Sequence, residues 1–289
     1  MEPFALIRPS KRFGQNFIRD QNIANRLVTT ANLGKGDTVL EPGSGYGTIT
    51  RIILRTEASN VLAVERDHRL AAYLRQAFQD EPRVSILEGD VLRIEIPEFN
   101  KIVGTPAYNI SSKLVLLMLR REFSLASTMF QLEFGRRLLA KPGSKDYGRL
   151  SVMSSTGLEV ESVAKIPRTA FRPTPRVDSI LLRIRKKTIR SDLDQGLFEW
   201  IVRESFTQRR RLIKGSIRHA IGNRLGDELG DSIVSRMNIP PIRVDQVTPG
   251  EFELLTQQMT EALERDSIPS TGLMMEPRRS RGHETDLDR

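Results

Sequence analysis

The first half of the chain alternates short apolar runs with segments whose apolar residues recur at helical spacing. The strand-like runs lie at 37–41, 61–65 and 84–87 and begin again at Lys101, and the helix-like segments lie at 20–30, 49–55, 69–78 and 112–121. Asp20 is the expected cap of the first of these helices. Strands that alternate with helices in this way are typical of a parallel sheet with helices on both faces. Such a sheet binds its ligand beyond the carboxyl ends of its strands.

The second half changes character after Lys187, where the strand-like alternation gives way to helical spacing. Helical spacing continues from Leu193 to about Glu264, with Thr248 as the expected cap and Pro249 in the first turn of a final helix. The residues beyond are rich in Pro, Ser, Gly, Arg and Asp, which is typical of disorder. We therefore expect an α/β domain over 1–187, a small all-α domain over 188–265 and a disordered tail over 266–289.

A glycine-rich turn follows the first strand, within the sequence Val39–Thr50. Its glycines, Gly43, Gly45 and Gly47, would let the backbone approach a ligand closely. The helix that follows presents unpaired N–H groups at its amino terminus, where a nucleotide-like cofactor can lie. A glycine cluster alone is weak evidence, because an ordinary strand-to-helix turn can have the same composition.

The spacing of these glycines discriminates between cofactors. A dinucleotide fingerprint requires a glycine three positions after Gly45, but that residue is Thr48. The carboxylate of Glu41, at the end of the first strand, would also repel a pyrophosphate. A cofactor with a cationic centre and an ammonium group fits better, which favours S-adenosylmethionine over NAD.

Two further acids stand where later strands of the predicted sheet end. Glu65 lies about 20 residues after the glycine turn, where an acid can accept hydrogen bonds from both hydroxyls of a ribose. Asp90 follows the third strand, where a carboxylate can accept a hydrogen bond from an exocyclic amine such as that of adenine. Because the carboxyl ends of parallel strands share one edge, the sequence predicts a nucleoside site at this edge.

Composition narrows the class of protein further. The 289 residues are 38% hydrophobic and 28% charged, and no apolar run approaches the roughly 20 residues that span a bilayer. The chain has no cysteine, and its three histidines are too scattered to form a metal site. We expect a cytoplasmic protein with no metal and no membrane partner. The net charge of +9 makes nucleic acid the first candidate ligand.

Several separated motifs resemble, in their order, those of the ribosomal RNA adenine dimethyltransferase family. The motifs are KRFGQNF at 11–17, ExGxG at 41–45, Glu65, GD at 89–90, EFGRR at 133–137, YGRLSV at 147–152 and FRPTPRVDS at 171–179. An ordered set of this kind is far more specific than any single motif. The chain is therefore identified as a member of this family, of the small-subunit type, over most of its length.

The resemblance implies a Rossmann-like S-adenosylmethionine methyltransferase domain followed by the helical domain. It also implies dimethylation of N6 of adjacent adenosines in small-subunit ribosomal RNA, with that RNA or a pre-ribosomal particle as partner and a role in ribosome biogenesis. We expect a monomer. The residues placed at the cofactor are Gln15, Asn16, Ile18, Glu41, Gly43, Gly45, Glu65, Arg66, Asp90, Val91 and Thr105. Tyr108 and Phe171 would hold the flipped target adenine, beside Thr105 and Ala107.

The chain departs from the family in its fourth motif. An adenine amine is a poor nucleophile until hydrogen-bond acceptors draw on its protons, and the family supplies an Asn amide there. This chain reads Thr105-Pro106-Ala107-Tyr108, so the aromatic is kept and the amide is lost. The threonine hydroxyl and backbone carbonyls can still accept. We expect a working enzyme, and keep as the alternative a catalytically impaired member that acts as an RNA-binding ribosome-assembly factor.

The helical domain contains the expected RNA contacts. If one helix runs continuously from Phe198 to Ile221, its apolar residues fall on one side and its cations on the other. The cations on that side are Arg203, Arg210, Arg211, Lys214 and Arg218, and Arg209 is added as part of QRRR at 208–211. Because QRRR at 208–211 also resembles the family's RNA-facing motif, we expect these side chains to contact phosphates.

Overall fold

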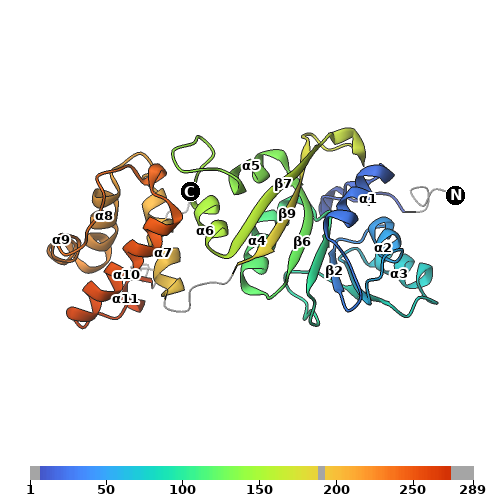
Figure 1. Ribbon diagram of the computed structural model, residues 1–289, viewed down its shortest axis with the longest axis horizontal. Coiled ribbons are helices and arrows are strands. Elements are labelled where there is room, and N and C mark those ends of the chain that lie inside the picture. The colour runs from blue at the N-terminus through green and yellow to red at the C-terminus, as the bar shows by residue number, and fades with distance from the viewer. Residues whose placement is uncertain (1–6, 188–192, 275–289) are drawn as a thin grey trace, which may run out of the picture. The chain divides into compact units, whose positions relative to one another are not determined.

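The structure is a computed structural model that describes residues 7–187 and 193–274 (Figure 1). The chain divides into two compact units. The first unit comprises 1–141 and 145–189, and the second comprises 142–144 and 190–289. The domain boundary expected near residue 187 adjoins residues 188–192, which lie outside the described ranges.

A seven-stranded sheet forms the centre of the first unit. Its strands are β2 Thr38–Pro42, β3 Asn60–Glu65, β4 Val84–Glu88, β5 Lys101–Gly104, β6 Leu125–Gln131, β7 Leu158–Ile166 and β9 Ser179–Lys186. Their order in the sheet is β4-β3-β2-β5-β6-β9-β7. The pairs from β4 through β6 are parallel, as predicted, whereas β9 pairs antiparallel with both β6 and β7. Strands β7 and β9 lie beyond the segments for which parallel pairing was predicted, and they pair antiparallel because the chain returns from β7 to β9 without a crossover helix.

Helices cover both faces of this sheet, as the alternation predicted (Figure 1). They are α1 Gln21–Thr30, α2 Thr48–Ile53, α3 His68–Ala77, α4 Ser111–Arg120, α5 Leu132–Leu138 and α6 Arg149–Gly157. Neighbouring residues of one strand face opposite layers. Val39 of β2 packs in a core with residues of α1 and α2, and Leu40 packs in a core with residues of α4 and α5. Burial on both sides explains why the strands read as continuous apolar runs.

Two predicted helix caps are confirmed. The side chain of Asp20 accepts hydrogen bonds from two N–H groups in the first turn of α1. In the second unit the Thr248 hydroxyl accepts the N–H of Glu251, and Pro249 begins the helix α10 Pro249–Arg265. Each cap satisfies N–H groups that a helix leaves unpaired, so local sequence was enough to predict both starts.

The second unit is helical, as predicted. Besides α10 it contains α7 Gln195–Phe206, α8 Ile213–Leu225, α9 Asp227–Ser235 and α11 Thr271–Met274. The prediction of disorder over 266–289 is wrong for residues 266–274. Leu273 of α11 is completely buried, and Met274 lies against Gly196 of α7. Residues 275–289 lie outside the described ranges. Within those ranges, no helix combines the length and the apolar character needed to cross a membrane.

Gly47 shows how tightly the glycine turn is packed. It precedes α2 with a φ of 74°, in the left-handed region that favours glycine. A Cβ atom at this position would lie 2.7 Å from a ring carbon of Phe78. Both the backbone conformation and the packing therefore require glycine here.

We expect Gly47→Ala to lower the free energy of unfolding by about 1–3 kcal/mol, because alanine would be strained and would push against the Phe78 ring. Gly36→Ala is the matched control, since Gly36 also has a positive φ of 85° but nothing lies within 4 Å of an added Cβ. Urea denaturation followed by circular dichroism measures both variants. An equal loss in the two would show that the contact with Phe78 is not needed to explain the effect.

Candidate active site

A pocket lies at the carboxyl edge of the sheet, where the chain reverses its direction of strand addition. From β2 the chain adds β3 and β4 on one side and then returns to add β5 on the other side of β2. The ends of these four strands contribute Gly43, Glu65, Asp90 and Thr105 to the pocket lining. A crevice at such a switch point is where open α/β sheets bind ligands.

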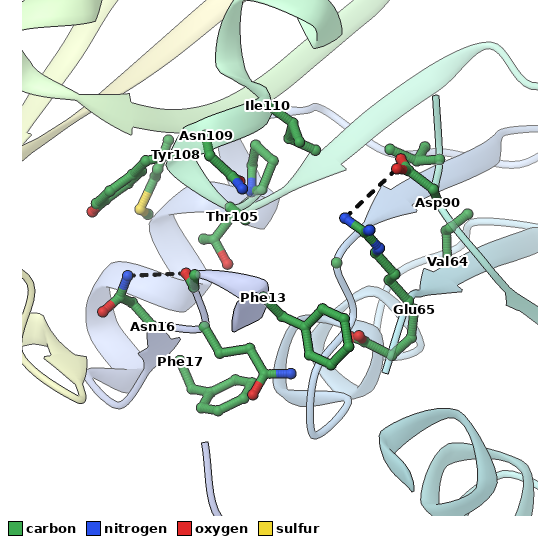
Figure 2. Close-up of a pocket in the computed structure, with 18 of the residues that line it drawn as sticks. Phe13, Asn16, Phe17, Val64, Glu65, Asp90, Thr105, Tyr108, Asn109 and Ile110 are labelled. Carbon is green, nitrogen blue, oxygen red and sulfur yellow. Dashed lines mark hydrogen bonds and ion pairs between the residues drawn. The ribbon is translucent and has the colours of Figure 1, made fainter. Parts of the chain in front are cut away.

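Most of the predicted site residues meet in this pocket. Those that line it are Gln15, Asn16, Gly43, Glu65, Arg66, Asp90, Val91, Thr105, Ala107, Tyr108 and Phe171. Figure 2 shows Asn16, Asp90 and Tyr108 around a common space. Across the described part of the chain, no group of three or more His, Asp or Glu side chains could hold a metal ion.

Three predicted cofactor residues lie outside the pocket lining. Ile18 is 3% exposed and packs in the core beside α1. Gly45 stands in the glycine turn, where its N–H donates to Oε2 of Glu65 at 2.8 Å. Glu41 is 1% exposed, and its Oε2 accepts the hydroxyl of Thr50 at 2.6 Å. Glu41 and Gly45 therefore belong to the turn behind the pocket, and Ile18 belongs to the core.

Glu65 connects two of the turns that surround the pocket. Its Oε2 accepts the N–H of Gly45 and its Oε1 accepts the N–H of Asp67, both at 2.8 Å. Burial raises the pKa of Glu65, although these two N–H groups stabilise its ionised form. Each carboxylate oxygen keeps a second lone pair, so the side chain can still accept a hydrogen bond from a ligand hydroxyl.

The amino-terminal segment is hydrogen-bonded to the turn that contains Asp67. Gln15 Nε2 donates to Oδ2 of Asp67 at 3.0 Å, and Gln15 Oε1 accepts the N–H of Ser10 at 2.6 Å. Asp67 also caps α3 and bonds to Arg69 at 2.6 Å, which holds the pKa of the Asp67 carboxyl at about 2. The segment therefore forms one wall of the pocket and brings Phe13 into the lining (Figure 2).

Asp90, the predicted acceptor for an adenine amine, already has two neighbours. Its Oδ1 accepts the N–H of Leu92 at 3.1 Å, and Arg66 Nη1 lies 3.7 Å from its Oδ2. Figure 2 shows this ion pair as a dashed line. The Arg66 guanidinium also lies 5.6 Å from the centroid of the Phe13 ring. Arg66 is thus held beside the predicted adenine position by a carboxylate and an aromatic ring.

The loop after β5 brings its aromatic into the pocket through a short 3-10 helix, Tyr108–Ile110. The Tyr108 hydroxyl lies 2.6 Å from Oγ of Ser179, which is fully buried at the start of β9. Burial raises the pKa of Tyr108, so its phenol stays protonated at neutral pH. Ala107 has φ −57° and ψ 135°, values that proline can adopt. A proline at this position would therefore need no change in the backbone conformation of Ala107.

Phe171 reaches the same pocket from a distant part of the sequence. It lies in β8 Phe171–Arg172, which pairs with β1 Phe17–Ile18 in a separate two-stranded sheet. The Phe171 side chain is 2% exposed and lines the pocket together with Tyr108. Pairing with β1 ties this aromatic to the amino-terminal segment, so long-range contacts hold both predicted adenine-binding rings.

Several pocket residues were not predicted. They include Phe13, Gly14, Phe17, Val64, Asn109, Ile110 and Met129. The two phenylalanines lie in the motif at 11–17, so their motif position was an available signal. Asn109 directly follows Tyr108 and is exposed, and its side chain has no hydrogen-bond partner among residues 7–187 and 193–274. Its amide is therefore free to bind a ligand.

The second unit separates the predicted RNA-binding cations into two sets. The condition of one continuous helix over 198–221 is not met, because α7 ends at Phe206 and α8 begins at Ile213. The first set, Arg203, Arg209 and Arg218, pairs with Glu204, Asp245 and Asp231. The second set is Arg210, Arg211 and Lys214. These three side chains are exposed, and no acidic group of the described residues lies within 4.0 Å of them.

The sheet order, its two helical layers and the pocket at its switch point define a Rossmann-like methyltransferase. A sequence profile described as "Ribosomal RNA adenine dimethylase" matches residues 8–256. The chain belongs to that family, as its motifs indicated.

Individual relatives agree with this assignment. The "Probable ribosomal RNA small subunit methyltransferase A" of Pyrococcus abyssi is 35% identical over 258 residues, which are 88% of this chain and 93% of that protein. The structure of the 23S rRNA methyltransferase ErmE superposes with a TM-score of 0.63 at 29% identity, over 85% of this chain and 100% of that chain. A dimethyladenosine transferase from Plasmodium falciparum shares the fold, with a TM-score of 0.73 at 22% identity over 87% of this chain and 98% of that chain.

Glu41 is an acid enclosed at the end of β2. Burial raises its pKa to about 8. The hydrogen bond from Thr50 lowers the pKa, and the neighbouring carboxylate of Glu65 raises it, but burial has the largest effect. The side chain is therefore largely protonated at neutral pH. A neutral Glu41 would not repel a pyrophosphate, contrary to what we expected from its charge. The preference for S-adenosylmethionine over NAD therefore depends on the glycine spacing.

We expect the wild type to lose stability relative to Glu41→Gln as the pH rises from 4.5 to about 8. In that window the unfolded chain releases the Glu41 proton and the folded chain retains it, so a rising pH favours the unfolded state. Glutamine keeps the acceptor for Thr50 but cannot ionise. Urea midpoints of both proteins at intervals across this window measure the effect. Parallel pH curves for the two proteins would contradict the raised pKa.

Proposed function

We propose that this protein transfers methyl groups from S-adenosylmethionine to N6 of adjacent adenosines in small-subunit ribosomal RNA. One observation carries the proposal: strand-end acids, a glycine turn and two aromatic rings from separate segments meet in one pocket. Family membership supports ribosomal RNA adenine as the substrate, and the name of the Pyrococcus abyssi relative supports the small subunit. The net charge of +9 suits a polyanionic partner.

The residues of the pocket fit the cofactor. Glu65 keeps lone pairs that can accept the ribose hydroxyls, and the Asp90 carboxylate can accept the adenine amine beside Arg66. Gly43 has a φ of 79°, and an added Cβ would meet nothing closer than 3.9 Å, so its backbone is open to a ligand. When bound, S-adenosylmethionine supplies an electrophilic methyl group. The protein then has to align the acceptor amine, which needs positioning more than acid or base catalysis.

Tyr108 and Phe171 supply the aromatic faces for a target adenine. Stacking of this kind contributes about 1–3 kcal/mol per base. Tyr108 is held through Ser179, and Phe171 is held through the pairing of β8 with β1. Because both rings are fixed before the base arrives, the cost of flipping the base is offset by surfaces that are already in place.

Hydrogen-bond acceptors for the target amine come from the loop that precedes Tyr108. Thr105 is half-buried and lines the pocket, and its carbonyl oxygen lies 3.9 Å from the position of a Cβ on Gly43. The Thr105 hydroxyl and the carbonyls of the loop can accept the amine hydrogens in place of the lost amide. The free amide of Asn109 adds a further acceptor at the rim of the pocket.

A second candidate function is favoured by the loss of the Asn amide at Thr105. It is an RNA-binding ribosome-assembly factor with impaired chemistry. In either case we place the protein in the cytoplasm as a monomer that acts on small-subunit RNA or on a pre-ribosomal particle. The exposed cations of the second unit support contact with the RNA backbone.

Mass spectrometry of the RNA tests the proposed function. The protein is incubated with S-adenosylmethionine and unmodified small-subunit particles or naked small-subunit RNA. We expect monomethyladenosine and dimethyladenosine in the product. Tight binding of particles without methylation would favour the assembly factor, and neither binding nor methylation would overturn both candidates.

We expect Tyr108→Ala to slow methyl transfer by about 10- to 100-fold, because one stacking face for the target base is lost. The dissociation constant for S-adenosylmethionine should stay near the wild-type value in isothermal titration calorimetry. Tyr108→Phe is the control, since it keeps the ring and removes only the bond to Ser179. If transfer and cofactor binding fall together, Tyr108 has a structural role instead.

Restoring the family's fourth motif should raise the rate of transfer. The change is Thr105→Asn with Pro106→Leu and Ala107→Pro, and the gain should be about threefold or more, because an amide carbonyl is a better acceptor here than a hydroxyl. Thr105→Val, which removes the hydroxyl at nearly the same volume, should lower the rate. Single-turnover methylation of small-subunit RNA measures all three proteins. An unchanged or lower rate in the restored motif would show that this loop does not limit the chemistry.

A further inference from the structure

Leu212 occupies an unusual position for an exposed apolar residue. It is 52% exposed, in the turn between α7 and α8 of the second unit (Figure 1). Arg210, Arg211 and Lys214 flank it in the sequence, and these are the exposed cations that have no acidic partner among the described residues. An apolar side chain thus lies within the set of charges that is free to bind phosphates.

Backbone hydrogen bonds hold this turn against a second segment of the same unit. Ile213 donates its N–H to the carbonyl of Ile242 at 2.9 Å, and Val244 donates its N–H to the carbonyl of Arg211 at 3.0 Å. Leu212 itself forms an antiparallel bridge with that segment. The turn is therefore ordered before any ligand arrives, which lowers the entropy cost of using it for binding.

The start of α8 adds positive potential at the same place. The helix has 13 residues, begins directly after Leu212 and has no side-chain cap. Its first-turn N–H groups and its macrodipole favour an anion beside them. The side chain of Arg211 lies over this turn, with Nε 3.3 Å from the position of a Cβ on Gly215. Backbone and side-chain charge therefore create one anion-attracting surface around Leu212.

Exposure alone does not distinguish Leu212, because single exposed leucines are common on soluble proteins. Leu254 of α10 is also 52% exposed. Its sequence neighbours include Glu251 and Glu253, whose carboxylates would repel a polyanion. The two leucines expose the same fraction of their surface, and the sign of the charge around them differs.

We propose that Leu212 is a contact residue of the RNA-binding surface. Its side chain packs against riboses in the minor groove of a helical segment of ribosomal RNA, while Arg210, Arg211 and Lys214 bind phosphates that border the groove. This inference rests on the proposed function, because it takes ribosomal RNA as the substrate.

The geometry of RNA selects this groove. The minor groove of A-form RNA is wide and shallow and displays its 2′-hydroxyls, whereas the major groove is too deep and narrow for side chains to read. A short apolar side chain between cations fits the shallow groove. Phosphate contacts give an affinity that falls with salt, but burial of a leucine gives an affinity that salt changes little. The two kinds of contact can therefore be separated by experiment.

The experiment measures binding of the full-length protein to an unmodified small-subunit RNA transcript between about 50 and 200 mM salt. Leu212→Ala, which adds no capping hydroxyl to the start of α8, should weaken binding by about three- to tenfold, by the same factor at each salt concentration. Arg210→Gln should instead weaken binding most at low salt and reduce the salt slope by about one. Leu212→Met should keep near-wild-type affinity, and the matched control Leu254→Ala should change nothing.

Unchanged affinity in Leu212→Ala, or equal losses in Leu212→Ala and Leu254→Ala, would overturn the inference. A duplex DNA with the sequence of an RNA helix in the transcript provides a second arm, because its minor groove is narrow. A loss of affinity for this DNA as large as the loss for RNA would also overturn the inference. A wild-type protein that does not bind the transcript would overturn it as well. Circular dichroism and thermal melting verify that each variant is folded. A wild type that binds the transcript without methylating it contradicts the proposed function, while the Leu212 comparison stays measurable.

Discussion

The carboxylate of Glu65 is the interaction on which the rest of the pocket depends. One oxygen holds the glycine turn through the N–H of Gly45, and the other holds the entry to α3 through the N–H of Asp67. Asp67 in turn binds Gln15 and with it the amino-terminal segment. Three walls of the pocket are therefore joined through one acid that is only 7% exposed. Because a buried carboxylate is costly without its donors, these walls stabilise one another.

The antiparallel edge of the sheet supplies contacts that hold the aromatic side chains of the pocket. Tyr108 follows a parallel strand, but its hydroxyl meets Ser179 at the start of β9. Phe171 lies in β8, between β7 and β9, and lines the pocket while β8 pairs with β1. The two aromatic rings thus come from different parts of the fold, and each is held by a contact made far away in the sequence. The proposed binding of a target base by these rings needs fixed positions more than it needs a titrating group.

Charge is arranged differently in the two units. In the first unit, burial raises the pKa of Glu41 at the end of β2 to about 8, and this side chain is therefore largely protonated at neutral pH. In the second unit, internal acids neutralise some of the cations that the sequence assigned to RNA, as in the pair of Arg218 with Asp231. Arg210 and Lys214 have no such partner among the described residues. Exposed pairs of this kind add little stability, but they remove a charge from the surface that a phosphate encounters.

The sequence by itself determined the features that depend on neighbours in the chain. Apolar spacing determined the parallel strands and their helices, Asp20 and Thr248 marked two helix starts, and the ordered motifs identified the family. Only the tertiary structure decided that Glu41 lies behind the pocket and that Phe171 joins Tyr108 within it. It also decided which cations are neutralised. The physical reason is that burial and pairing are made between residues far apart in sequence, and no local pattern of residue types encodes those distances.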